Sequence, residues 1–246
     1  MTPPLFQLRL DPRLIERFPD YTALVLYVED LTNGPSDAHS IAALRVAERE
    51  QRAAFAGRKA AEHPHIQAWR AAYGAFGAKP SKYRCSVEAL LTRTLNGQDL
   101  PAINRIVDLY NAVSVRHVLP VGGEDWERLD GDLVLTEASG TEPFVTLEAG
   151  EEVTAYPEVG EVIWADRLGI TCRRWNWRQG RRTLLTTETR QAYFVLDRLA
   201  PYTEDALMAA GDELVGLLRA VSPACRMTRV LLGGAHGPEG QRITMP

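Results

Sequence analysis

The chain has 246 residues, 45% of them hydrophobic and 24% charged, which is the composition of an ordinary globular protein. Its formal net charge of −4 argues against nucleic-acid binding through the whole surface, so an RNA contact would need a local basic cluster. No apolar run is long enough to span a membrane, and the N-terminus lacks a basic and then apolar signal pattern. We therefore expect a cytoplasmic protein that makes no membrane contact.

The first half of the chain is predicted to be mostly helical after two short strands. Pro64 fits the first turn of a helix and Ser86 fits an N-cap, while Gly77 and Gly97 fit helix ends. The predicted strands are 6–10 and 22–28, and the predicted helices are 40–56, 64–76, 86–95 and one that begins at Asn104.

The second half changes to short β-branched segments separated by Gly, Pro or Asp, which is typical of an antiparallel meander. Hairpin turns are expected at 166–169 and 177–180, and two closing helices near Thr187 and after Thr203. The predicted strands are 133–135, 144–147, 151–154, 159–165, 170–174 and 183–186.

These patterns predict the α+β class, with a helical first half, an antiparallel meander or sandwich in the second half, and helices packed at the ends. We expect one compact unit. Its core is 61–200, 1–60 extends it with a strand pair and a helix, 201–232 adds a helix and strand, and 233–246 is a flexible tail.

Three polar residues recur at helical spacing in the segment that begins at Asn104. Asn104, Asp108 and Asn111 share one face, and Gly122-Gly123 follows shortly after Pro120. The glycines would let a ligand approach the backbone closely. The alternative is that the polar stripe bonds neighbouring loops, which the periodicity alone does not exclude.

A second candidate site combines aromatic and basic residues near the middle of the second half. Indole rings offer stacking faces and guanidinium groups bind phosphate or carboxylate, a mixture that would suit the acceptor end of a tRNA or an amino acid. Alternatively the two tryptophans pack on one face of a strand and the arginines are solvated. The residues are Arg173, Arg174, Trp175, Trp177, Arg178, Arg181 and Arg182, and a further basic group is Arg45, Arg49, Arg52, Arg58 and Lys59.

The sequence contains no motif for a metal, a cofactor or nucleotide hydrolysis. Its cysteines, Cys85, Cys172 and Cys225, form no C-x-x-C pair. His63, His65 and His117 lack the spacing of metal ligands. We expect neither a bound metal nor a cofactor.

The segment Asn104-x-x-Val107-Asp108-x-x-Asn111 resembles the B3/B4 domain of the bacterial phenylalanyl-tRNA synthetase beta subunit. The flanking segments 83–91 and 172–180 agree with free-standing members of that family, and the resemblance covers about residues 65 to 198. In the synthetase this domain edits, hydrolysing the ester of tRNA mischarged with tyrosine. The chain is too short to hold a catalytic domain as well, so the resemblance does not imply an ATP-dependent ligase.

The resemblance also implies positions for an editing pocket. The family's pocket asparagine falls on Asn111, whereas its threonine position holds Tyr110 and its histidine position holds Gly122. The family's pocket glutamate has no counterpart near the Arg173–Arg182 segment, so we expect a reshaped pocket.

Two hypotheses follow. In the first, the chain hydrolyses a mischarged aminoacyl-tRNA in trans, with a water positioned by Asn111 and the oxyanion held by amides of Gly122-Gly123. In the second, the same pocket binds a free amino acid or an aminoacyl end without chemistry. Both use Asn104, Asp108, Tyr110, Gly122, Gly123, Arg174 and Asn176 to bind substrate, and Arg173, Trp175, Trp177, Arg178, Arg181 and Arg182 to bind RNA.

Overall fold

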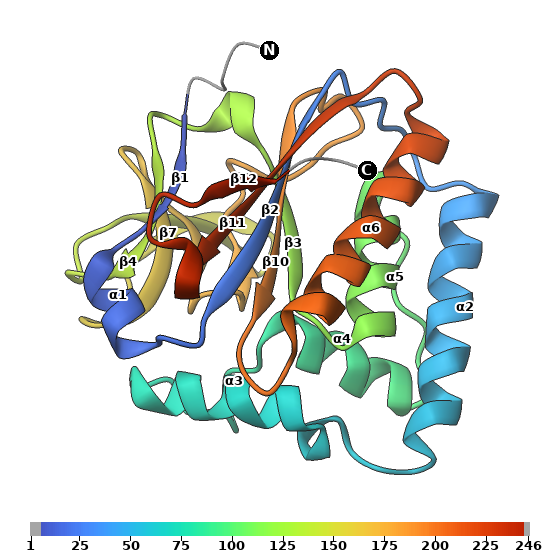
Figure 1. Cartoon of the computed structure of the whole chain (residues 1–246), viewed down its shortest axis with the longest axis horizontal. Helices are drawn as coiled ribbons and strands as arrows, with labels where there is room; N and C mark the ends of the chain where they lie inside the picture. The colour runs from blue at the N-terminus through green and yellow to red at the C-terminus, as the bar shows by residue number, and fades with distance from the viewer. Residues whose placement is uncertain (1–5, 244–246) are drawn as a thin grey trace.

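A computed structural model describes residues 6–243 of the chain (Figure 1). Five antiparallel strands form the central sheet, in the order β12-β11-β2-β10-β3. These strands are β2 (Thr22–Glu29), β3 (Val121–Asp125), β10 (Ala192–Arg198), β11 (Arg226–Gly233) and β12 (Gln241–Ile243).

The middle strand β2 is buried on both of its faces because its apolar run fills two cores. Leu24, Leu26 and Val28 pack under the helices, and Ala23 and Val25 point to the opposite face. Alternation along a strand sends successive side chains to opposite faces, so a continuous apolar run fits a sheet covered on both sides.

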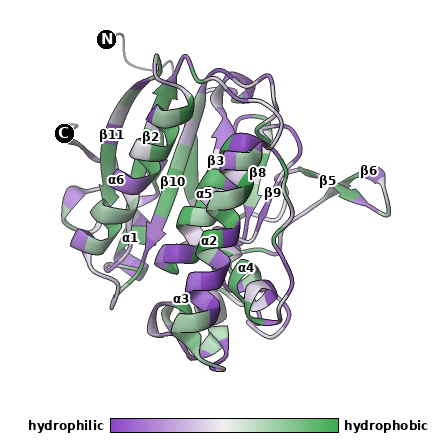
Figure 2. Cartoon of the chain, turned by 90° about the vertical axis from the view of Figure 1, so that its right-hand side faces the viewer, coloured by the Kyte–Doolittle hydropathy of each residue, from purple (hydrophilic) through white to green (hydrophobic). Residues whose placement is uncertain are grey.

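A second sheet packs beside the central one in the order β1-β4-β7-β8-β9. It pairs β1 with β4 in parallel and is otherwise antiparallel. Strands β5 (Phe144–Glu148) and β6 (Glu151–Ala155) form a separate hairpin that projects from the rest of the chain (Figure 2). The members of the second sheet are β1 (Leu8–Leu10), β4 (Leu133–Glu137), β7 (Val162–Asp166), β8 (Gly169–Arg173) and β9 (Arg178–Gln179).

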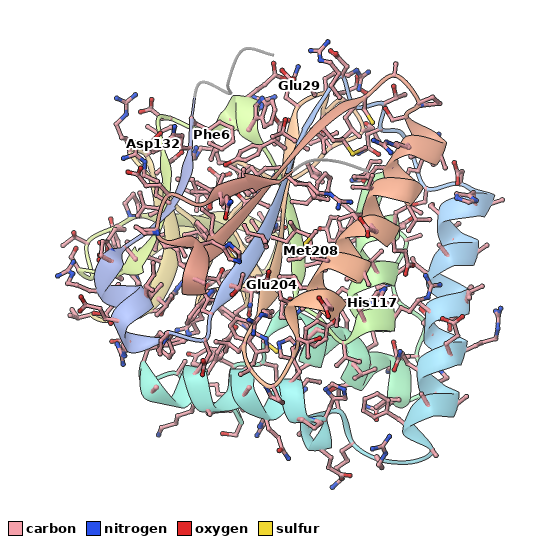
Figure 3. The ribbon with its side chains drawn as sticks, viewed as in Figure 1. Phe6, Glu29, His117, Asp132, Glu204 and Met208 are labelled. Carbon is pink, nitrogen blue, oxygen red and sulfur yellow. The ribbon has the colours of Figure 1, made fainter. Side chains whose placement is uncertain are left out.

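Helices cover the face of the central sheet that lies away from the second sheet. The helices α5 and α6 lie directly on it, and α2 packs against α5 from outside (Figure 1). His117 at the end of α5 faces α6, where its Nε2 lies 2.7 Å from Glu213 Oε2 (Figure 3). The helices are α1 (Pro12–Arg17), α2 (Ala38–Phe55), α3 (Pro64–Ala75), α4 (Ser86–Leu95), α5 (Arg105–His117) and α6 (Glu204–Val221).

The predicted α+β class is confirmed, as are the four helices of the first half and the hairpin turn after Asp166. Three predictions for the second half of the chain were wrong. The expected helix near Thr187 is a turn that leads into β10, because 192–196 is an apolar strand segment. The expected strand at 183–186 contributes one bridge, from Leu184 to Glu124. The hairpin turn expected at 177–180 lies at 174–177.

The terminal segments are integral to the fold rather than additions to it. The expected N-terminal strand pair does not form, because β1 and β2 belong to different sheets. The segment expected to be a loose tail forms β12 against β11, and the Leu10 amide donates to the Pro238 carbonyl. Residues 244–246 of that predicted tail lie outside the described residues.

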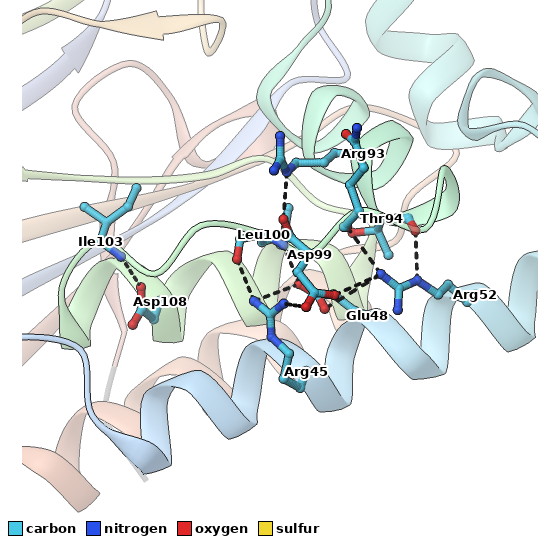
Figure 4. Close-up of polar contacts among 10 residues, drawn as sticks. Arg45, Glu48, Arg52, Arg93, Thr94, Asp99, Leu100, Ile103 and Asp108 are labelled. Atoms are coloured by element: carbon cyan, nitrogen blue, oxygen red, sulfur yellow. Dashed lines mark hydrogen bonds and ion pairs between the residues drawn. The ribbon is translucent and has the colours of Figure 1, made fainter.

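Two of the five residues in the second basic group, Arg45 and Arg52, pair with neighbouring carboxylates (Figure 4). Arg45 pairs with Glu48 at 3.2 Å and with Asp99 at 2.7 Å. Arg52 donates to the Thr94 carbonyl at 2.9 Å and pairs with Asp99 at 3.4 Å. These arginines therefore fasten the segment after α4 to α2.

Among residues 6–243 no helix is long and apolar enough to cross a membrane.

Candidate functional site

The polar stripe of α5 divides into a structural part and a part that faces a cavity. Asn104 is the N-cap, and its Oδ1 accepts from the Val107 amide at 3.0 Å. Asp108 accepts from Ser40 Oγ and from the Ile103 amide, both at 2.8 Å. These two side chains hold the start of α5 and lie away from the cavity, whereas Asn111, one turn further on, lines it.

The cavity has a volume of about 310 Å³ and lies where α4 and α5 meet both sheets. Tyr110 and Asn111 come from α5, and Ser86 comes from the first turn of α4. Asn176 and Trp177, which are distant from these in sequence, also line the cavity, and the Ser86 amide donates to the Asn176 carbonyl at 2.9 Å. The structure thus brings Asn111 and Asn176 to one site.

Strand β3 supplies one wall of the cavity, and its two glycines differ. A Cβ at Gly122, which lines the cavity, would meet only Gln179 Nε2 at 3.5 Å. A Cβ at Gly123 would lie 2.6 Å from the Phe194 ring. Gly123 is therefore required by packing against β10, and Gly122 leaves space that a side chain could fill.

The pairing of β3 with β10 limits the use of these amides as oxyanion donors. The Asp197 amide donates to the Pro120 carbonyl, and Gly122 lies opposite Val195. Hydrogen-bonded and non-hydrogen-bonded residue pairs alternate along an antiparallel ladder. Gly122 and Val195 lie two positions from the bonded pair Pro120 and Asp197, so they are also a hydrogen-bonded pair and the Gly122 N–H donates to β10. The Gly122-Gly123 pair is thus a strand segment and not the glycine loop that the sequence suggested.

The turn between β8 and β9 separates the aromatic residues of the second candidate site. Arg174 and Trp175 both have left-handed backbone, with φ of 46° and 67°. Both indoles line the cavity, but Trp175 is fully buried in the aromatic core beside Tyr21 and Trp69, whereas Trp177 is only partly buried.

Most arginines of this segment bind carboxylates of the chain itself. Arg173 donates to Glu161 at 2.8 and 2.7 Å, and Arg182 donates to Asp166 at 2.8 and 2.7 Å. Arg181 is half-exposed and lies 3.7 Å from Glu152. Arg178 lines the cavity, lies 5.2 Å from the Trp177 ring centre, and makes no ion pair within residues 6–243.

Two buried carboxylates that the sequence reasoning missed line the cavity. Burial raises the pKa of Asp197 to about 6, although hydrogen bonds from Tyr21 and Asn176 favour its charged form. Burial likewise raises the pKa of Glu124, against the opposing effect of the nearby Thr183, Tyr193 and Thr171 hydroxyls. Glu124 Oε2 has no hydrogen bond of ordinary geometry to any described residue.

A chain of hydrogen-bonded side chains runs from Tyr73 through Asn176 to Asp197. Tyr73 OH donates to Asn176 Oδ1 at 2.9 Å, and Asn176 Nδ2 donates to Asp197 Oδ2 at 3.1 Å. Tyr21 OH donates to the other oxygen of Asp197 at 2.6 Å. Asn176 is thereby held in one orientation, while the Asn111 side chain makes no hydrogen bond to a described residue.

The site contains no activated nucleophile among the described residues. Burial raises the pKa of the Cys172 thiol well above its ordinary value, so this cavity cysteine is protonated at neutral pH. No cluster of His, Cys, Asp or Glu in residues 6–243 could hold a metal ion. Buried carboxylates, free amides and water are the chemistry that the cavity offers.

Both missed carboxylates had a signal in the sequence. Glu124 alternates with Gly122 along β3, so a strand prediction for 121–125 would have placed them on one face. Asp197 follows the apolar run 192–196, which the expected helix near Thr187 obscured.

A sequence model of the family described as B3/4 domain matches residues 68–210. Among solved structures, the chain is similar to an N-terminal fragment of the phenylalanyl-tRNA synthetase beta-subunit from Pyrococcus horikoshii. The identity is 12% and the TM-score 0.48, over 90% of this chain and 50% of that one. The chain therefore spans half the length of that structure. No curated protein matches the chain.

Proposed function

The chain belongs to the B3/4 domain family, and from that membership together with the cavity we propose that it acts on the aminoacyl end of tRNA, hydrolysing the ester of a mischarged aminoacyl-tRNA in trans. The observation that carries the proposal is the meeting of Asn111, Asn176 and the buried carboxylates Glu124 and Asp197 around one cavity. The resemblance in sequence had assigned the pocket asparagine to Asn111 alone.

The proposed reaction is attack of a bound water on the ester carbonyl. The free amide of Asn111 orients this water, and Asp197, whose pKa of about 6 lies near the working pH, accepts its proton. The ester C–O bond then breaks, and the terminal ribose hydroxyl leaves with the proton from Asp197. Asn176 holds Asp197 in place through its hydrogen bond.

The cavity also favours a class of amino acid. Its walls are aromatic and apolar apart from a few polar groups, among them Glu124, whose Oε2 is unsatisfied within residues 6–243. Leaving a buried acceptor unpaired costs free energy, so a side chain that donates a hydrogen bond gains from binding there. We propose a substrate amino acid with a hydroxyl or amino group, larger than alanine.

A screen of the parent protein for deacylation of every aminoacyl-tRNA tests the proposal. The Asn111→Ala variant is then assayed on the tRNA whose amino acid the parent releases. We expect Asn111→Ala to lower the rate by about one to three decades, since one water-orienting or oxyanion hydrogen bond contributes ~2–4 kcal/mol. Asn96→Ala, an exposed asparagine at the end of α4, is the matched control and should leave the rate unchanged.

The second candidate is a binding module without chemistry, and the lack of a described nucleophile or metal cluster is compatible with it. If no charged tRNA loses its amino acid in the screen while a free amino acid still binds, the deacylase proposal fails and the binding module replaces it.

A further inference from the structure

A second hollow, of about 470 Å³, lies on the other side of the β8–β9 turn from the cavity. It is bounded by the loop after α3, by the loop before β7, and by Arg174. The cavity and the hollow share a wall, since Tyr83 lines the hollow and its ring centre lies 5.1 Å from that of Trp177, which lines the cavity.

Arg174 is held rigidly at the floor of this hollow. Its guanidinium carbon lies 3.6 Å from the Tyr83 ring centre and 4.6 Å from that of Trp177. Arg174 is 5% exposed as a whole residue, and its backbone is in the left-handed region, a conformation that costs free energy in a non-glycine residue. Such strain persists only where the surroundings over-determine it, so the side chain is preorganised.

The guanidinium of Arg174 is only partly satisfied. Its Nη2 lies 3.2 Å from Glu161 Oε2, but Nη1 has no hydrogen-bond partner within residues 6–243. Glu161 is already bound by Arg173 through two hydrogen bonds. One carboxylate therefore serves two buried arginines, and one positive charge of this group is uncompensated.

The rim of the hollow adds further positive charge. The chain has three lysines, and two of them, Lys79 and Lys82, line the hollow and are exposed. Glu158 and Glu161 also line the hollow, so its three positive and two negative residues leave an excess of one positive charge on a chain whose net charge is −4. A planar guanidinium beside mobile ammonium groups matches a phosphate group.

We propose that this hollow is a phosphate-binding site that holds a backbone phosphate of the RNA end whose aminoacyl group enters the cavity. This assignment rests on the proposed function, because it links the hollow to the cavity through one ligand. The uncompensated positive charge of the Arg174 guanidinium attracts the phosphate, and Lys79 and Lys82 bind it from the rim.

Amine-selective acetylation read by mass spectrometry tests the site with the intact chain. The probes are the ribonucleotide CCA carrying a 5′-phosphate, and inorganic phosphate. At about ten times its Kd the trinucleotide occupies roughly nine-tenths of the sites, so acetylation of Lys79 and Lys82 should slow by about tenfold. Lys59, exposed after α2, is the internal control and should react at an unchanged rate.

Measuring the affinity of variants for the trinucleotide provides a second test of the site. The double variant Lys79→Ala/Lys82→Ala alters only exposed side chains and should weaken trinucleotide binding by about tenfold. The slope of log K against log salt should become shallower by about 0.7 for each lysine–phosphate pair that the variant removes. Lys59→Ala should match the parent. Arg174→Lys keeps the charge but not the planar fork, and should also weaken binding.

The outcomes separate the alternatives. Unchanged acetylation of Lys79 and Lys82 with both probes overturns the phosphate site, even if deacylation is found. Protection by the trinucleotide without deacylation of any tRNA supports the site and contradicts the proposed function. Equal protection by inorganic phosphate and trinucleotide at the same concentration assigns the hollow to a free phosphate compound and overturns its link with an RNA end.

Discussion

Replacing Asp197 by asparagine should change how the stability of the protein depends on pH. Asp197 is 3% exposed, and burial raises its pKa from an ordinary value of 3.8 to about 6. Below pH 3.8 the carboxyl is protonated in both the folded and the unfolded state, so it does not change the free energy of unfolding there. Between the two values the folded state keeps a proton that the unfolded state releases, so the free energy of unfolding falls as pH rises.

The size of the effect follows from the shift. One pKa unit corresponds to about 1.4 kcal/mol, so the destabilisation grows to about 3 kcal/mol and is constant above pH 6. Asp197→Asn removes this titration but also weakens the hydrogen bonds from Tyr21 and Asn176. The difference in unfolding free energy between parent and variant should therefore depend on pH, and its pH-independent part reports the weakened hydrogen bonds.

Urea unfolding at a series of pH values from 4 to 8 measures this difference. The contributions of other buried acids, such as Glu124, to the pH dependence of the unfolding free energy are the same in parent and variant, so they cancel in the difference. Asp20→Asn, at an exposed position, is the matched control. Parallel curves for the parent and Asp197→Asn would refute the reasoning. If Asp197 also accepts the proton in deacylation, the parent rate should rise with pH through about 6 and level off, and the variant should lose that rise.

Further predictions concern β3 and the cavity rim. Gly123→Ala should lower the unfolding free energy by about 1–3 kcal/mol because its Cβ would overlap Phe194, whereas Gly122→Ala should change it by less than about 0.5 kcal/mol; urea midpoints compare them. Gly122→His should keep the fold and change which amino acid is released in the deacylation screen, since its side chain fills the open space. Arg178→Ala should weaken tRNA binding and leave stability unchanged. Arg182→Ala removes the ion pair of the buried Asp166 side chain, which keeps only backbone amide donors, and should lower stability while leaving tRNA binding unchanged; filter binding and thermal melts distinguish the two.

The sequence was informative wherever a local rule decides the structure. Helix periodicity placed α2 to α5, because burial of one helix face is a local requirement. The N-cap expected at Ser86 was wrong: Ser86 is the first residue of α4, and its N-cap Cys85 makes no side-chain cap hydrogen bond. The same periodicity put Asn104, Asp108 and Asn111 on one stripe. It could not show that the first two bond within the fold and the third faces a cavity, since that depends on Val107, Ser40 and Ile103 around them.

The site was less predictable because its geometry depends on distant segments. The left-handed backbone at Arg174 and Trp175 has no glycine or asparagine to signal it, yet it decides which indole enters the core. The pairing of Arg173 with Glu161, and of Arg182 with Asp166, is likewise a tertiary result. Most arginines of this basic segment are therefore in internal ion pairs, and Arg178 has none with residues 6–243.

The place of β2 in the central sheet has a consequence for synthesis on the ribosome. Val25 lies opposite Val195 on one side and opposite Val230 on the other. Strand β2 is therefore synthesised long before both of its partners, and it stays an apolar, unpaired segment until β10 and β11 have emerged. Contacts between such distant residues slow folding, and exposed strand edges invite aggregation. We expect the nascent chain to depend on chaperones, and the segment 68–210 expressed alone to be insoluble because it lacks β2.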